Sequence, residues 1–398
     1  MQGKERLNQW SWKDYVKNML MILLKLPAWA VQLLMFWLPL KKNRILIYSL
    51  KQHGYSCNLK YFTEYLNRNY PEKFEILWAV RRPEDLQMLR QHEIPAVMVR
   101  SWQHWCYRMR AGIVVTNYEF YPMFRKRRGQ LYVNTWHGGI NYKKIGYEGL
   151  AFSNAIQKLI YHMNNPCPDV FVSGSRSFTE TTSDSFRFPR EIFLECGMPR
   201  NDALVQHQDP ERIRRIKQRL GIPEGKKLVL YAPTFRKGNH TPAGQMAFDR
   251  VLHQLSATFG GEWMGMVRNH YFVDAEAGME GILDVSRYED MQELLMISDC
   301  LISDYSSCMW DYLLTGRPCF VFAPDMEEYE NTDRSFFIPM NRWPYPISDT
   351  VDTLCDQIAK FDSLQYKNRI NEHRLEFGSF DQGIACKTLV DWIFSHMQ

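Results

Sequence analysis

The sequence lacks the short motifs that identify several large enzyme classes. No GxxxxGK[ST] pattern is present, which excludes a P-loop enzyme, and no GxGxxG follows an expected strand, so nothing supports NAD binding. The patterns HExxH and GxSxG and the protein-kinase set are also missing, as is a DxD-type metal motif near the residues discussed below. We therefore expect no cofactor and no required metal ion.

Cysteine provides no structural framework. The nine cysteines are scattered along the chain, and none are spaced as CxxC, so neither a zinc site nor a set of disulfides is indicated. Most of them lie in or beside apolar runs, as Cys196, Cys300 and Cys319 do. This pattern is typical of buried free thiols in a reducing compartment.

Neither sign of charge is in large excess. The net charge is only +5, and no RNP-like or zinc-finger pattern is present, so we expect no nucleic-acid partner. The apolar fraction of 45% and the charged fraction of 23% are typical of a globular protein. A chain of 398 residues is too long for one ordinary core, which favours two domains. Basic residues together with 21 Tyr, 12 Trp and 23 Phe fit an anionic substrate and a membrane surface equally well.

A long uninterrupted apolar run is also missing. Residues 19–40 are the most apolar stretch, but the longest charge-free part, Leu26 to Leu40, is shorter than the roughly 20 residues of a spanning helix. Basic residues flank or interrupt the stretch, and tryptophans accompany it: Lys13, Lys17, Lys25, Lys41, Lys42, Arg44, Trp10, Trp12, Trp29 and Trp37. We therefore expect residues 1–43 to associate with the surface of an anionic leaflet. The alternatives are a buried helical hairpin, a true membrane span and, less favoured, a signal peptide.

From residue 44 onward, short apolar runs alternate with helical patterns. Such alternation predicts an α/β fold with parallel sheets covered by helices. In the first half we expect strands at 45–49, 75–80, 96–99, 113–117, 130–135, 170–173 and 192–195. A charged helix at 210–220 looks like a bridge, and strands restart at 228–232, 264–268, 300–302 and 319–323, with helices at 351–361 and 380–396. We predict two Rossmann-like domains facing a cleft, at 44–222 and 223–375, with 376–398 packing back on the first.

The segment Leu301 to Ala323 reads as strand, loop, helix, turn and strand, which is one βαβ unit. Its polar loop contains Ser306 and Ser307 and follows the strand, where open α/β sheets bind ligands. Either serine can cap the helix, and the free amides beside them suit an anion. The alternative is that these serines only cap the helix.

Other polar residues also follow expected strands. His137 lies in TWHGG, where Gly138 and Gly139 permit close approach of a ligand and the imidazole can take a proton from a hydroxyl. Arg268 and His270 end a strand of the second half and suit a phosphate. Each of these residues taken alone is more simply a structural or loop residue. Further candidates are Arg200, Asn201, Asp202, Thr234, Arg236, Glu327 and Glu328; Asn201 or Asp202 can equally cap a helix, and the two glutamates can equally begin an exposed one.

Taken in order, these segments resemble one known family. WHG at 136–138, GMPRND at 197–202, YAPTFR at 231–236, RNH at 268–270, SDYSS at 303–307, RP at 317–318 and DMEEYE at 325–330 resemble the CDP-glycerol glycerophosphotransferase family. The resemblance extends over roughly residues 44–340. It implies a GT-B-like fold and peripheral attachment to the cytoplasmic face of the membrane. It also implies transfer of a polyol phosphate, glycerol phosphate or ribitol phosphate, from a CDP-activated donor to a lipid-linked or polymer acceptor, with release of CMP. A glycosyltransferase using a nucleotide sugar is the alternative, and a non-enzymatic membrane-bound assembly partner is the third hypothesis.

The resemblance also implies roles for individual residues. His137 resembles the base that activates the acceptor hydroxyl, and His270 with Arg268 resembles the donor-side pair near the pyrophosphate. Ser306 and Ser307 match the phosphate-binding loop, which Asp304 orients. The remaining substrate-binding candidates are Arg200, Asn201, Asp202, Thr234, Arg236, Gly138, Glu327 and Glu328. The chain departs from the family after WHG, where members commonly continue as T-P-L-K and this sequence reads GINYK, so a different acceptor or polyol is expected.

Overall fold

The computed structural model describes most of the chain. The described residues are 12, 16, 19, 20, 23, 29–49, 54–118, 126–149, 161–162, 165–206, 209–234, 246–269, 281–326, 329 and 336–397. The chain divides into two compact units. The first comprises Met1–His137, Ile145–Arg200 and Ile384–Gln398, and the second comprises Gly138–Lys144 and Asn201–Gly383. The segment directly after His137 therefore belongs to the second unit.

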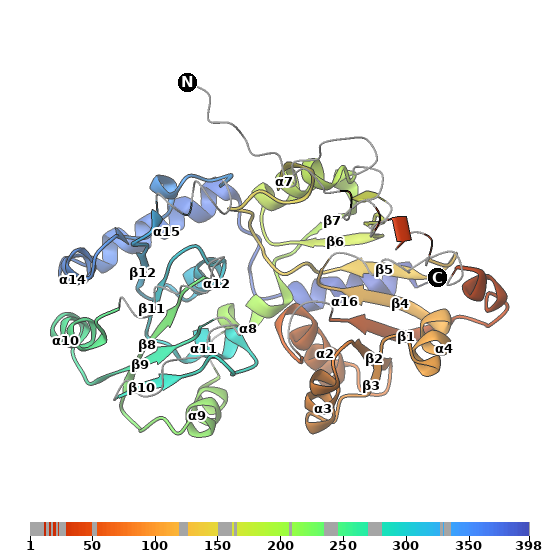
Figure 1. Cartoon of the computed structure of the whole chain (residues 1–398), viewed down its shortest axis with the longest axis horizontal. Coiled ribbons are helices and arrows are strands. Elements are labelled where there is room, and N and C mark those ends of the chain that lie inside the picture. Colours follow the sequence, from red (N-terminus) through yellow and green to blue (C-terminus); the bar gives the residue numbers. More distant parts are fainter. Residues whose placement is uncertain are drawn as a thin grey trace. The chain divides into compact units, whose positions relative to one another are not determined.

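The first unit is built on a seven-stranded sheet in which all pairings are parallel (Figure 1). The strand order is β3-β2-β1-β4-β5-β6-β7. The strands are β1 (Lys41–Tyr48), β2 (Glu75–Val80), β3 (Ala96–Met98), β4 (Ala111–Thr116), β5 (Leu131–Asn134), β6 (Val170–Ser173) and β7 (Phe193–Glu195). All six residues of β4 are buried, as expected for a central strand of a sheet that is covered on both faces.

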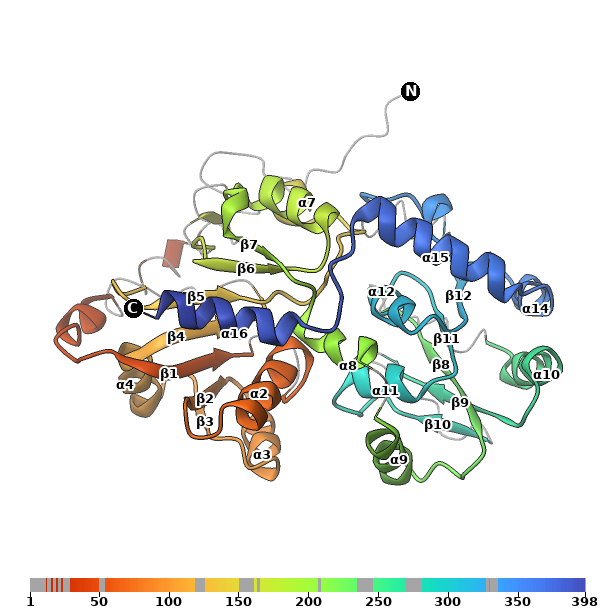
Figure 2. The ribbon, with the colours of Figure 1, turned by 180° about the vertical axis from the view of Figure 1, so that it is seen from behind.

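Helices cover the first sheet. They are α2 (Cys57–Asn69), α3 (Pro83–Gln91), α4 (Trp102–Arg110), α5 (Gly146–Gly149), α7 (Arg176–Phe186) and α16 (Ala385–His396). Helix α16 runs along this sheet (Figure 2), and its Leu389, Val390 and Ile393 share one core cluster with Ile45 and Trp78. The last helix of the chain thus completes the core of the first unit.

The second unit has a six-stranded parallel sheet in the order β10-β9-β8-β11-β12-β13. Its strands are β8 (Lys227–Ala232), β9 (Trp263–Val267), β10 (Ile282–Asp284), β11 (Cys300–Ser303), β12 (Cys319–Phe322) and β13 (Ile347–Ser348). Its helices are α8 (Asp202–Val205), α9 (Pro210–Arg219), α10 (Phe248–Phe259), α11 (Met291–Ile297), α12 (Cys308–Tyr312), α14 (Val351–Ala359) and α15 (Ser363–Phe377). The predicted α/β class with parallel sheets is confirmed in both units.

The structure corrects the sequence prediction at several elements. Helix α15 was not predicted, because its polar sequence shows no clear apolar stripe and only Tyr366, Ile370 and His373 are buried. The short strands β10 and β13 also escaped prediction, because two or three residues carry too little periodicity. The helix predicted from residue 380 begins at Ala385, after Gly383 in the left-handed region with φ +80°.

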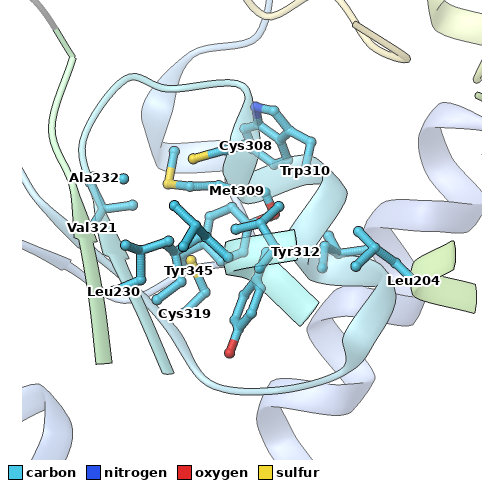
Figure 3. Close-up of a cluster of buried hydrophobic side chains, with 14 of the residues drawn as sticks. Leu204, Leu230, Ala232, Cys308, Met309, Trp310, Tyr312, Cys319, Val321 and Tyr345 are labelled. Carbon is cyan, nitrogen blue, oxygen red and sulfur yellow. The ribbon is translucent and has the colours of Figure 1, made fainter. Parts of the chain in front are cut away.

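The βαβ unit after β11 forms as predicted. Helix α12 continues into a 3₁₀ turn at Leu313–Thr315, and Gly316, with φ +67°, ends it. Side chains of α12, including Met309 and Trp310, pack with those of the strands and Tyr345 in one buried cluster (Figure 3). This packing fixes the helix directly behind Ser306 and Ser307.

Near the N-terminus, only part of the apolar stretch is described. In residues 29–40, Gln32 and Met35 are buried, whereas Leu34 and Trp37 are exposed. None of the helices that the structure describes combines the length and apolar character needed to cross a membrane.

Candidate active site

His137 follows β5 through a strained turn. Trp136, immediately before it, has φ +48°, a left-handed conformation that is unfavourable for a bulky residue. The Trp136 amide donates a 2.8 Å hydrogen bond to the side-chain oxygen of Asn134, the last residue of β5. Strain of this kind persists only where surrounding contacts hold it, and it is concentrated at functional sites.

The His137 ring is oriented by a neighbouring strand. Its Nδ1 lies 3.1 Å from the backbone oxygen of Asn117, which follows β4. A carbonyl oxygen can only accept, so Nδ1 carries the proton and Nε2 is the basic nitrogen of the neutral ring. The Tyr118 and Trp136 rings flank the imidazole, with centroids 5.2 Å and 4.6 Å from it. The half-buried ring therefore has the tautomer that a general base needs.

Two buried side chains hold the backbone around His137. Asn58 of α2 donates hydrogen bonds of 2.9 Å to the carbonyl oxygens of both Thr135 and Trp136. Arg200 donates from Nη1 to the His137 carbonyl oxygen at 2.8 Å. The Arg200 amide in turn donates to Asn58 Oδ1 at 3.1 Å. Arg200, predicted to bind substrate, thus contacts the loop that carries His137, the predicted base.

The residues after His137 are anchored in the second unit. At Gly138, an added Cβ would lie 3.9 Å from the Ile140 carbonyl oxygen, the nearest atom among the described residues other than its chain neighbours. The Tyr142 ring stacks on Trp310 of α12 with a centroid distance of 3.3 Å, and its hydroxyl lies 2.7 Å from His373 Nε2. Lys143 forms an isolated antiparallel bridge with Phe336. Residues 139–143, which depart from the family pattern, therefore pack through Tyr142 against α12. This helix follows the loop of Ser306 and Ser307, called the serine loop below.

In the second unit, Asp304 joins two predicted loops. Its fully buried carboxylate accepts from the Thr234 amide at 2.8 Å and from the Thr234 hydroxyl at 2.6 Å. It also accepts from the Tyr305 amide. Thr234 follows β8 and Asp304 follows β11, and these strands are neighbours. The carboxylate therefore fixes the loops at the carboxyl edge of this sheet, where α/β folds bind ligands.

The serines of this loop make little use of their hydroxyls within the protein. Ser307 occupies the N-cap position of α12 without a side-chain capping hydrogen bond, and it is exposed. Ser306 is half-buried, and its hydroxyl accepts only a long 3.4 Å contact from the Cys308 amide. The alternative that they serve only as helix caps finds little support in this geometry.

Arg268 follows β9, on the other side of β8. Its amide donates to the Tyr231 carbonyl oxygen at 2.9 Å, and the amide of Asn269 donates to Ser286 Oγ at 2.9 Å. Within the part of the chain that the structure describes, the buried atoms Arg268 Nη1 and Asn269 Oδ1 have no hydrogen-bond partner. A guanidinium nitrogen in this state suits an anionic ligand.

Asn201 does not cap a helix with its side chain, which was one of the predicted alternatives. Its Oδ1 instead accepts from Gln292 Nε2 at 2.9 Å, and the same nitrogen donates to Asp311 Oδ2 of α12 at 3.1 Å. Asp202 begins α8. His270, Arg236, Glu327 and Glu328 lie outside the described residues.

Sequence reasoning missed the residues that hold these loops. Asn58, Asn117, Asn134, Tyr142 and Gln292 were not predicted as site residues. The signal available for Asn58 was its place in the loop after the first strand, and Asn117 is the last residue of a predicted strand. No group of three or more His, Cys, Asp or Glu side chains able to hold a metal ion occurs among the residues that the structure describes.

Comparisons with known proteins agree with this arrangement. The family model for CDP-Glycerol:Poly(glycerophosphate) glycerophosphotransferase matches residues 30–395. The teichoic acid poly(glycerol phosphate) polymerase of Bacillus subtilis is 32% identical over 90% of this chain and 49% of its own length. The teichoic acid glycerol-phosphate transferase of Staphylococcus aureus is 29% identical over 88% of this chain and 93% of its own length.

A solved structure of the wall teichoic acid polymerase TagF is similar with a TM-score of 0.76 and 27% identity, covering 96% of this chain and 98% of that chain. The fold is therefore GT-B-like. This chain spans about half the length of the Bacillus subtilis polymerase and most of the Staphylococcus aureus transferase. The resemblance predicted from the ordered motifs is confirmed, and the chain belongs to the CDP-glycerol:poly(glycerophosphate) glycerophosphotransferase family.

Proposed function

We propose that this protein transfers a polyol phosphate, glycerol phosphate first and ribitol phosphate second, from a CDP-activated donor to a hydroxyl of a lipid-linked or polymer acceptor. CMP is released, and the product belongs to a cell-wall or capsular polymer. The observation that carries the proposal is His137, whose Nδ1 is committed to the Asn117 carbonyl so that Nε2 can accept a proton. Family membership and the names of the relatives support the same reaction class.

The proposed reaction is a displacement at the β-phosphorus of the donor. The acceptor oxygen forms a bond to this phosphorus while the bond to the oxygen of CMP breaks. The acceptor's proton passes to His137 Nε2, and CMP leaves with the bonding electron pair. Such phosphoryl transfer depends mainly on positioning and on stabilisation of negative charge.

The donor side is assigned to the second unit. Arg268 supplies positive charge, and the Ser306 and Ser307 hydroxyls donate to phosphate oxygens. Asp304 and Thr234 hold the loop in place through their mutual hydrogen bonds. His270 and Arg236 are proposed to add charge near the pyrophosphate, and Glu327 and Glu328 to accept hydrogen bonds from the ribose. Gly138, Asn201 and Asp202 complete the proposed substrate-binding set.

Peripheral attachment to the cytoplasmic face of the membrane is part of the proposal. Five described helical positions before residue 24 share a helix-like spacing and are 47% to 80% exposed: Trp12, Val16, Met19, Leu20 and Leu23. Exposed apolar side chains at these positions, in a sequence that also contains basic residues, support an interfacial helix. A flotation assay with anionic vesicles tests this assignment; full retention of binding after removal of residues 1–43 contradicts it.

A donor panel tests the reaction. Purified protein is incubated with CDP-glycerol, CDP-ribitol and UDP- and GDP-sugars, each with a lipid-linked acceptor. We expect CMP release from a CDP-polyol and no nucleotide release from the sugar donors. UDP or GDP release would identify a glycosyltransferase instead, and failure of calorimetry to detect any nucleotide binding would indicate a non-enzymatic role.

A further inference from the structure

Asn58 has an environment that only an asparagine side chain satisfies. It is completely buried at the start of α2. Its amide nitrogen faces two carbonyl oxygens, those of Thr135 and Trp136, each at 2.9 Å, and its oxygen faces the amide of Arg200 at 3.1 Å. Carbonyl oxygens cannot donate and a backbone amide cannot accept, so the orientation of the carboxamide is fixed.

The hydrogen-bond partners of Asn58 are backbone groups of residues next to His137, the predicted base, or in contact with it. The Trp136 carbonyl, to which Asn58 donates, belongs to the peptide unit between Trp136 and His137. The Arg200 amide donates a hydrogen bond to Asn58, and the Arg200 side chain donates one to the carbonyl of His137 itself. The intervening residue Trp136 is left-handed, with φ +48°. Such a conformation is unfavourable by roughly 1–2 kcal/mol in an L-residue and needs contacts that define it.

We infer that Asn58 is a positioning residue for His137, acting through the main chain and not by touching substrate. The inference rests on the proposed function, because it takes His137 as the base. By fixing the peptide units on both sides of the strained turn, Asn58 keeps the imidazole where Nδ1 meets the Asn117 carbonyl. Without its two donated hydrogen bonds the turn relaxes, the ring leaves Asn117, and Nε2 no longer points at the acceptor hydroxyl.

The sharpest variant is Asn58→Asp, which keeps the shape and replaces the donating amide by an acceptor facing two carbonyl oxygens. We expect kcat to fall about 100-fold, the size of effect that a small misplacement of a catalytic group produces, while KM for CDP-glycerol changes less than about threefold. The matched control is Asn69→Asp in the same helix, where the amide is exposed and donates to the Tyr65 carbonyl. This control should keep wild-type kcat.

A loss of kcat alone would also follow from partial unfolding, so a spectroscopic readout is needed. In ¹⁵N-histidine-labelled protein, His137→Ala identifies the His137 signals. We expect the wild-type ring to show the Nδ1–H tautomer at neutral pH, and the Asn58→Asp ring to show a mixture of tautomers. If Asn58→Asp does not fold, Asn58→Ser, which retains one donor, is measured in its place with the same expected direction.

The outcomes separate the two proposals. Wild-type kcat together with an unchanged His137 tautomer in the folded Asn58 variant overturns the positioning role. Full activity of His137→Ala, or no CMP release by the wild type, overturns the proposed function, whereas the tautomer measurement still decides whether Asn58 orients the ring.

Discussion

The loop that carries His137 and the loop that carries Ser306 and Ser307 are held in opposite ways. Around His137, side chains of Asn58, Asn134 and Arg200 bond to the main chain, and the ring itself bonds to a backbone oxygen. In the loop of Ser306 and Ser307, the Asp304 carboxylate is tightly bonded, whereas Ser307 makes no side-chain capping hydrogen bond and Ser306 accepts a long contact. This difference fits the proposed roles, because a proposed base has to be oriented before its substrate arrives, whereas proposed phosphate-binding groups have to stay available for the ligand.

The strongest test of this contrast removes the base. His137→Ala should lower turnover with CDP-glycerol by about 10³-fold, within the range for loss of general base catalysis, because the variant lacks the proposed base. Binding of CDP-glycerol, measured by calorimetry, should stay close to wild type. Near-normal turnover would show that the aimed ring is not the base.

The second test concerns His373, whose Nε2 lies 2.7 Å from the hydroxyl of Tyr142 in the segment after His137. Burial, with a smaller contribution from Arg342, lowers the pKa of His373 from 6.5 to about 4. The unfolded chain therefore takes up a proton that the native ring does not, and the free energy of unfolding should fall as pH drops from about 6.5 to about 4. The full effect is on the order of 3 kcal/mol.

Denaturant titrations at pH 7 and pH 4.5 measure this dependence. His373→Gln should make the dependence shallower, because it removes the buried imidazole. His104 in the first unit, whose pKa burial lowers to about 3, retains part of the dependence in this variant. If the free energy of unfolding of His373→Gln changes with pH as much as that of the wild type, His373 does not contribute to the acid sensitivity.

The third test removes the acceptor at Asp304, whose carboxylate holds the serine loop. Asp304→Asn puts an amide nitrogen against donors that need an acceptor, and it should lower the free energy of unfolding by about 2 kcal/mol. The control is Asp352→Asn, which breaks an exposed ion pair with Arg250 and should have a clearly smaller effect, because water screens exposed pairs. Equal stabilities of the two variants, measured by urea titration, would contradict the assigned role of the Asp304 carboxylate.

The smallest effect is expected when the hydroxyl of Ser306 or Ser307 is removed. Ser306→Ala and Ser307→Ala should each weaken CDP-glycerol binding about fivefold, equivalent to roughly 1 kcal/mol for a lost hydrogen bond, with no change in melting temperature. Ser303→Ala should behave in the opposite way, because its buried hydroxyl donates to the Ala232 carbonyl oxygen at 2.6 Å. A loss of stability without a loss of affinity at Ser306 and Ser307 would mean that these hydroxyls serve the fold.

The elements that could be predicted are those whose signal is local. Apolar runs such as Ile45–Tyr48 and Leu228–Ala232 identified strands, and the serine loop with Gly316 identified a βαβ unit. Helix α15 escaped because its few buried residues are set among charged ones. The positions of His137, Thr234 and Asp304 at strand ends were predictable for the same local reason, whereas their partners were not.

The amino-acid sequence by itself determined the α/β class, the parallel sheets and, through seven ordered motifs, the family, because periodicity and motif order are carried by neighbouring residues. Only the tertiary structure decided how the His137 ring, the proposed base, is held. Asn58 donates a hydrogen bond to Trp136, which is 78 positions away, and Tyr142 contacts His373, which is 231 positions away. A sequence pattern does not connect residues so far apart. Such contacts exist only after the sheets have formed, since it is the packing of helices on strands that brings these side chains within hydrogen-bonding distance.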